Sequence, residues 1–124
     1  MENAAVAYEE KPTATGEDLD YILNGLRNDF YIKASNDLAE VVQRRLAAFH
    51  PGPNRGVKQA PFKVLVGATM PAALVEVGFI SNPEEERRLN DDAYQNKMAD
   101  AVLSGIKRYF AANPPLAKSR MAMQ

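Results

Sequence analysis

Residues 73–79 read Ala73-Leu74-Val75-Glu76-Val77-Gly78-Phe79, and this stretch is the strongest indication of the fold. Apart from one carboxylate it is a short apolar run bounded by turn residues, which predicts a strand buried on both faces. A second such run extends from Phe62 to Val66. The linker between the two runs is too short for a crossover helix, so the strands are predicted to be antiparallel or offset neighbours.

Apolar residues at helical spacing precede these strands. They predict one helix over about 17–30, with Thr15 as its N-cap, and a second over about 35–49, with Ser35 as its N-cap. Proline and glycine after residue 50 predict the loop that separates the second helix from the strands.

Two more helices are predicted after the strands. Asn82 is a candidate N-cap and Pro83 suits the first helical position, so a short helix is expected to about Leu89. A longer helix is predicted over about 91–111, with a core-packing stripe that includes Tyr94 and Tyr109.

These elements predict the α/β class, with helices packed on a mixed, mostly parallel sheet. The chain would supply about two strands and four helices, and a buried strand needs neighbours on both edges. The sheet is therefore expected to lack members, as in a fragment. The predicted organisation is a leading loop over 1–16, a folded unit over 17–112 and a flexible tail over 113–124.

Composition narrows the function. The formal net charge of the 124 residues is -1, which disfavours nucleic acid as a partner. Cysteine is absent and His50 is the single histidine, so the chain cannot supply a usual catalytic zinc set by itself. No apolar run is long enough to span a membrane, and the acidic start of the sequence does not suit a signal peptide.

Glu76 is the residue that most needs an explanation, because a lone carboxylate in an apolar strand is costly to bury. A desolvated carboxylate near the end of a strand can act as a general base. The alternative from the strand alone is a structural ion pair with Arg55, Lys58 or Lys63.

A family resemblance bears on this choice. The stretches that carry it are Arg55-Gly56-Val57-Lys58-Gln59-Ala60-Pro61-Phe62, Val64-Leu65 and Met70-Pro71-Ala72-Ala73-Leu74-Val75-Glu76-Val77-Gly78-Phe79-Ile80-Ser81-Asn82-Pro83-Glu84-Glu85. They resemble the closing block of the zinc-dependent N-acetylmuramoyl-L-alanine amidases, and weaker likeness extends from about residue 2 to 110. By this resemblance, residues 17–112 are the C-terminal part of an amidase catalytic domain.

The resemblance implies a peptidoglycan hydrolase of the cell envelope, periplasmic or extracellular, with an autolysin-like role in wall turnover. Zinc in the complete domain would polarise the amide carbonyl and activate a water. Glu76 matches the catalytic glutamate of the family, the general base on that water and then the proton donor to the leaving amine. The family's zinc ligands, two histidines and a glutamate, have no counterpart in this chain, so no residue is assigned to metal.

Other residues carry weaker predictions. Arg55 and Lys58 would contact substrate or pair with Glu76, and Asn82 would orient groups near Glu76 or cap its helix. His50 matches no ligand position and is interpreted as a surface or helix-capping residue.

Three functions therefore stay open. The chain is half of an amidase, completed by the missing N-terminal half of the domain and acting on peptidoglycan or muropeptides. Alternatively, it is a non-catalytic remnant or binding module of the same fold, in which a second copy covers the sheet edge as a swapped dimer. The third is a generic α/β interaction domain with an accidental likeness.

Overall fold

A single long helix, α1 (Gly16–Ala47), stands where two helices were predicted in this computed structural model, which describes residues 15–114. Thr15 is its N-cap, as predicted. The Thr15 hydroxyl accepts from the Asp18 backbone N–H at 3.3 Å, and an Asp18 carboxylate oxygen accepts from the Thr15 N–H at 2.9 Å. This reciprocal pair satisfies two otherwise unpaired donors at the helix start.

The predicted break before Ser35 is wrong. Residues 31–34 contain neither glycine nor proline, so nothing interrupts the backbone ladder there. The Ser35 hydroxyl instead accepts from the backbone N–H of Ala72 at 2.9 Å. Ser35 resembles an N-cap in the sequence, but its hydroxyl binds the backbone of a segment 37 residues further along the chain.

The two helices near the C-terminus form as predicted. Helix α2 (Pro83–Leu89) begins after its N-cap Asn82, and helix α3 (Asp92–Ala112) begins after its N-cap Asp91. Each cap side chain accepts backbone N–H groups of the first turn, which fixes where the helix starts.

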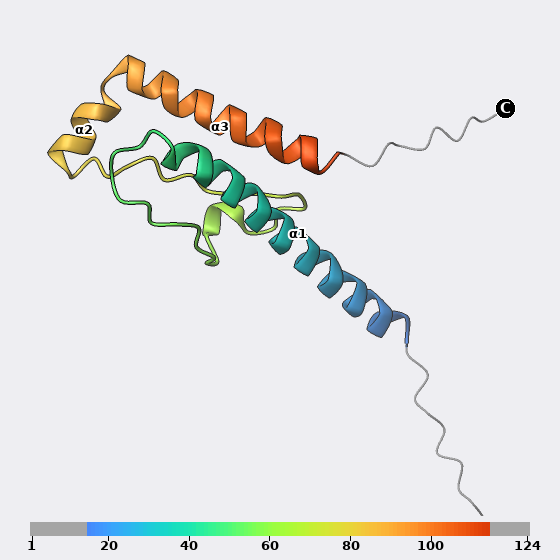
Figure 1. The fold of residues 1–124 in the computed structure, drawn as a ribbon. Helices are drawn as coiled ribbons and strands as arrows, with labels where there is room; N and C mark the ends of the chain where they lie inside the picture. Colours follow the sequence, from blue (N-terminus) through green and yellow to red (C-terminus); the bar gives the residue numbers. More distant parts are fainter. Residues whose placement is uncertain (1–14, 115–124) are drawn as a thin grey trace, which may run out of the picture.

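Helix α3 packs antiparallel along α1 (Figure 1). Val42 of α1 lies against Gly105 of α3, and Phe49, just past α1, meets Tyr94 at the start of α3. A Cβ added to Gly105 would lie 2.8 Å from the Val42 Cα, so the two backbones approach too closely for a side chain at this crossing.

The predicted α/β class is wrong for the structure described. Between residues 15 and 114 the regular elements are helices, and no strand forms. The predicted strand over 62–66 contains a short 3-10 turn, η1 (Lys63–Leu65), and 73–79 has no regular secondary structure. A strand exists only through a ladder of hydrogen bonds to a neighbour, and residues 15–114 bring no neighbour to either run.

The chain between α1 and α2 makes wide turns alongside α1 (Figure 1). The core is small as a result. In the described residues its buried hydrophobic members are Ala34, Val42, Met98 and Tyr109, and the stripe of α3 predicted to be core supplies the last two.

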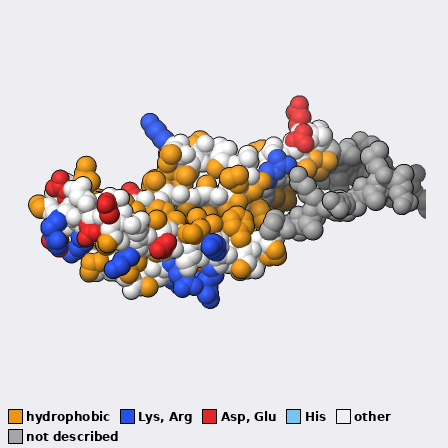
Figure 2. Space-filling view, turned by 90° about the horizontal axis from the view of Figure 1, so that it is seen from above, with side chains coloured by type: hydrophobic (Ala, Val, Ile, Leu, Met, Phe, Trp, Pro, Cys, Tyr) orange, Lys and Arg blue, Asp and Glu red, His pale blue; other side chains and the backbone are white. Residues whose placement is uncertain are grey.

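Many large hydrophobic side chains stay exposed. Figure 2 shows such side chains spread over the middle of the visible face, with charged groups mostly at its ends and edges. The exposed large hydrophobic side chains of the described residues include Leu23, Leu26 and Phe30 on α1 and Leu74 and Phe79 on the irregular segment. No helix in the described range is long and apolar enough to cross a bilayer.

Candidate functional site

Three of the four predicted site residues border one hollow between α1 and the chain over 52–79, here called the groove. Its volume is about 1390 Å³, and its lining includes Arg55, Lys58 and Glu76 but not Asn82. On the opposite wall lie α1 residues such as Tyr31 and Ser35. The groove lies between α1 and the irregular chain over 52–79, two segments that no described β-sheet connects.

Glu76 is exposed on this groove, and the expectation of a buried carboxylate is wrong here. That expectation assumed that its strand would lie inside a sheet. Among the ion pairs of residues 15–114, none involves Glu76, so the proposed structural pairing with Arg55, Lys58 or Lys63 does not form in this arrangement.

Two side chains hold Phe79, which lies three residues after Glu76. The Arg55 guanidinium carbon lies 5.0 Å from the centre of the Phe79 ring, a cation–π contact. A Glu85 carboxylate oxygen accepts the backbone N–H of Phe79 at 2.6 Å. Arg55 and Glu85 therefore contact the same residue, three positions after the predicted catalytic glutamate in the sequence.

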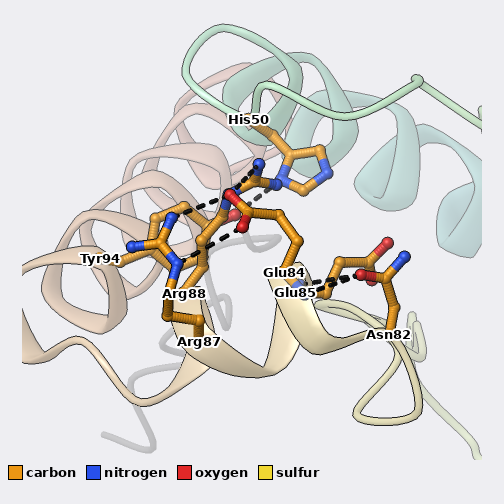
Figure 3. Close-up of polar contacts among 7 residues, drawn as sticks. All are labelled: His50, Asn82, Glu84, Glu85, Arg87, Arg88 and Tyr94. Carbon is orange, nitrogen blue, oxygen red and sulfur yellow. Dashed lines mark hydrogen bonds and ion pairs between the residues drawn. The ribbon is translucent and has the colours of Figure 1, made fainter.

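Asn82 acts as the cap of α2. Its side-chain oxygen accepts from the N–H groups of Glu84 at 3.0 Å and Glu85 at 3.2 Å (Figure 3). The capping alternative of the prediction is thus confirmed, and the same contact fixes the first turn of α2.

Glu84 is paired on the solvent side of α2. It binds Arg87 and Arg88 at 2.9 and 3.0 Å, and the hydrogen bond from Arg87 is the main cause that lowers the pKa of the Glu84 carboxyl (Figure 3). The three acidic residues of α2 therefore differ: Glu84 is engaged on the surface, Glu85 points to Phe79, and Glu86 is exposed.

His50 is half-buried and pairs with Tyr94. Its Nδ1 lies 2.7 Å from the Tyr94 hydroxyl oxygen, and the two residues share a hydrogen bond (Figure 3). A Cβ on Gly52 would lie 2.5 Å from the other ring nitrogen, so glycine there leaves room for the imidazole. His50 thus ties the end of α1 to the start of α3, a contact that the predicted surface or helix-capping role did not include.

The described residues do not fit a metal. Between 15 and 114, no three His, Cys, Asp or Glu side chains come together in a group that could hold an ion. A zinc ion would therefore need ligands from elsewhere.

Sequence reasoning missed Glu85 and the true role of Ser35. A signal for Glu85 was present, because an acid at the third helical position commonly reaches back to the backbone before the helix. Here it reaches beyond the N-cap to Phe79. For Ser35 no local signal exists, since its partner Ala72 lies 37 residues further along.

Comparison with known proteins identifies the family. Residues 7–108 match the N-acetylmuramoyl-L-alanine amidase family. The chain belongs to this family. Its relatives include the amidase AmiA of Salmonella typhimurium, 37% identical over 101 residues, which cover 82% of this chain and 35% of AmiA.

Two further relatives extend the comparison. The amidase AmiC of Escherichia coli is 35% identical over 100 residues, covering 81% of this chain and 24% of AmiC. The uncharacterized protein YqiI of Bacillus subtilis is 36% identical over 84 residues, covering 68% of this chain and 41% of YqiI. The chain thus spans less than half the length of these relatives. No solved structure matches it.

Proposed function

We propose that this chain contributes the catalytic glutamate, Glu76, to a peptidoglycan amidase of the cell envelope. The observation that carries the proposal is the family match over residues 7–108, which includes the whole segment around Glu76. The exposed side chain of Glu76 on the groove is compatible with access to a substrate.

The reaction is hydrolysis of the amide between N-acetylmuramic acid and L-alanine. Glu76 takes a proton from a water molecule as the water oxygen bonds to the amide carbon. The same carboxyl then gives the proton to the amide nitrogen as the carbon–nitrogen bond breaks. The products are a muramoyl carboxylic acid and the free amine of L-alanine.

The rest of the catalytic domain is proposed to pack against the apolar part of the groove and to leave the Glu76 carboxylate open to substrate. A volume of about 1390 Å³ exceeds the range of about 300–1,000 Å³ that is usual for small ligands. The exposed apolar residues around it, such as Leu74 and Val77, suit packing against further protein. Zinc ligands, if the complete domain holds zinc, would come from that part, because the described residues do not form a ligand set.

The alternative is a non-catalytic module in which a second copy covers the same surface. The segment over 73–79 favours this alternative, because its backbone forms no ladder within the described residues and can pair with another chain. Sedimentation of the purified chain separates the two: a monomer supports the amidase half, and a stable dimer supports the module.

The amidase proposal is tested by a chimera in which this chain replaces the matched 101 residues of Salmonella AmiA. We expect the chimera to release peptides from labelled peptidoglycan, and Glu76→Gln to lower its kcat by about 10²-fold or more, because the amide side chain cannot move a proton. Glu86→Gln, an exposed neighbour on α2, is the matched control and should keep full activity. A Glu76→Gln chimera as active as its parent would refute the role given to Glu76.

A further inference from the structure

The backbone around Glu76 is held from outside its own segment. Residues 73–78 have no regular secondary structure, so no ladder fixes their conformation. At one end, the Ser35 hydroxyl accepts the Ala72 N–H at 2.9 Å. At the other end, the Glu85 carboxylate accepts the Phe79 N–H at 2.6 Å.

The contact with Glu85 has the shorter donor–acceptor distance of the two anchors, 2.6 against 2.9 Å. Its acceptor carries a charge, and charge-assisted hydrogen bonds are shorter and stronger than neutral ones. It also lies nearer to Glu76, which is three residues from Phe79 and four from Ala72.

Gly78 allows helix α2 to come this close. A Cβ on Gly78 would lie 3.1 Å from the Glu85 carboxylate oxygen and 3.4 Å from the Leu89 Cδ1. A side chain at this position would thus push against the carboxylate that binds Phe79.

Asn82 places Glu85 for this contact. By capping α2 it fixes the first turn, and Glu85 at the third helical position then points back along the chain to Phe79. Glu84 and Glu86 lie on the same turn, but neither side chain bonds to the 73–79 segment.

From these contacts we propose that Glu85 is a positioning residue for Glu76. Its carboxylate, held by the start of α2, ties down the Phe79 amide and so sets where the Glu76 side chain enters the groove. This inference rests on the proposed function for the role of Glu76, but the contact between Glu85 and Phe79 is testable without it.

The contact is tested first on the chain alone, by amide exchange and backbone NMR. In Glu85→Ala we expect the Phe79 amide to exchange on the order of tenfold faster, and the amides of Val77 and Gly78 to become more mobile. Glu85→Gln keeps an acceptor oxygen and should retain part of the protection. Glu86→Ala should leave the Phe79 amide unchanged, which separates the contact from a general loss of α2.

The positioning role is tested in the AmiA chimera. We expect Glu85→Ala to lower kcat by on the order of 10–100-fold with little change in KM, because a misplaced base impairs the chemical step more than binding. Glu85→Gln should recover part of the loss. Gly78→Ala, which crowds the carboxylate and also strains a backbone with a φ of 157°, should lower kcat and Phe79 protection at least as much as Glu85→Ala.

The outcomes separate this inference from the proposed function. An unchanged Phe79 amide in Glu85→Ala, or a Glu85→Ala chimera as active as its parent while Glu76→Gln is inactive, would overturn the positioning role alone. A fully active Glu76→Gln chimera would overturn the catalytic role, and with it the reason for positioning, even where the Phe79 contact is found.

Discussion

At the residue scale, polar side chains accept backbone N–H groups that would be paired with a neighbouring strand in a sheet. Ser35 and Glu85 accept N–H groups from Ala72 and Phe79, at the two ends of a segment that has no ladder. Asn82 and Asp91 accept those at the starts of their helices. Of these four N–H groups only that of Ala72 is partly buried, and the other three are exposed, so the acceptors orient the irregular chain and the helix starts at its surface.

The caps show how much could be predicted at this scale. Thr15 and Asn82 were identified as caps because their partners lie within three residues. Ser35 has the same local signature, but it lies inside a continuous helix and its partner is distant in sequence. Polar contacts between residues close in sequence can be predicted from the sequence, whereas contacts between distant residues can be identified only in the folded structure.

The pairing of His50 with Tyr94 gives a prediction for one hydrogen bond. Tyr94→Phe removes the hydroxyl and leaves Nδ1 of a half-buried imidazole without its partner. We expect the free energy of unfolding to fall by about 0.5–1.5 kcal/mol, measured by urea denaturation.

Tyr21→Phe is the control, because Tyr21 is 80% exposed. It should leave the stability unchanged. Equal stability of the Tyr94→Phe variant and the parent would show that water replaces the lost hydroxyl without cost.

At the element scale, the helices follow from local pattern and the missing strands do not. Helix α1 carries its own backbone hydrogen bonds, so it forms without the rest of a sheet. The runs over 62–66 and 73–79 have the composition of strands, but a strand needs a partner to become one. Composition therefore predicted that both runs could form strands. Without a neighbouring strand in the described residues, the first contains a 3-10 turn and the second is irregular.

The crossing of α1 and α3 depends on a glycine. Gly105→Ala would place a methyl group 2.8 Å from the Val42 Cα, so the helices must move apart. We expect a loss of about 1–3 kcal/mol in the free energy of unfolding, measured by thermal or urea unfolding followed by circular dichroism.

Gly25→Ala provides a matched comparison in α1. A Cβ there meets nothing within 4 Å, and alanine costs less backbone entropy in a helix. This change should stabilise the chain by about 0.5–1 kcal/mol. If both substitutions stabilise, the close contact between the two backbones is not present in solution.

At the scale of the whole molecule, the described residues form a pair of long helices, α1 and α3, with one side uncovered within the range 15–114. Four buried hydrophobic side chains make the core of the described residues, while Leu74, Val77 and Phe79 face the outside. A surface of this kind is typical of one half of a domain whose other half supplies the cover.

This architecture predicts that the backbone amides of the isolated chain fall into a slowly exchanging and a rapidly exchanging group. Amides at the helix crossing, such as those of Val42 and Met98, should be protected, whereas those of 73–78 should exchange at nearly the free-chain rate. Phe79 should differ from its neighbours, because Glu85 binds its N–H.

Exchange in the AmiA chimera supplies the comparison. If the rest of the domain covers the groove, residues 73–78 become protected there. Strong protection of 73–78 in the isolated chain would instead mean that a ladder forms, and that a second copy supplies it.

The sequence by itself determined the amidase family, the helices near the C-terminus and the caps Thr15 and Asn82, because each depends on residues close together in the chain. Only the tertiary structure decided that α1 is continuous past Ser35, that 73–79 is not a strand, and that Glu85 holds the backbone beside Glu76. The physical reason is the same in each case. Helix and cap contacts close within a few residues, whereas a sheet and a positioned carboxylate depend on what the fold brings alongside.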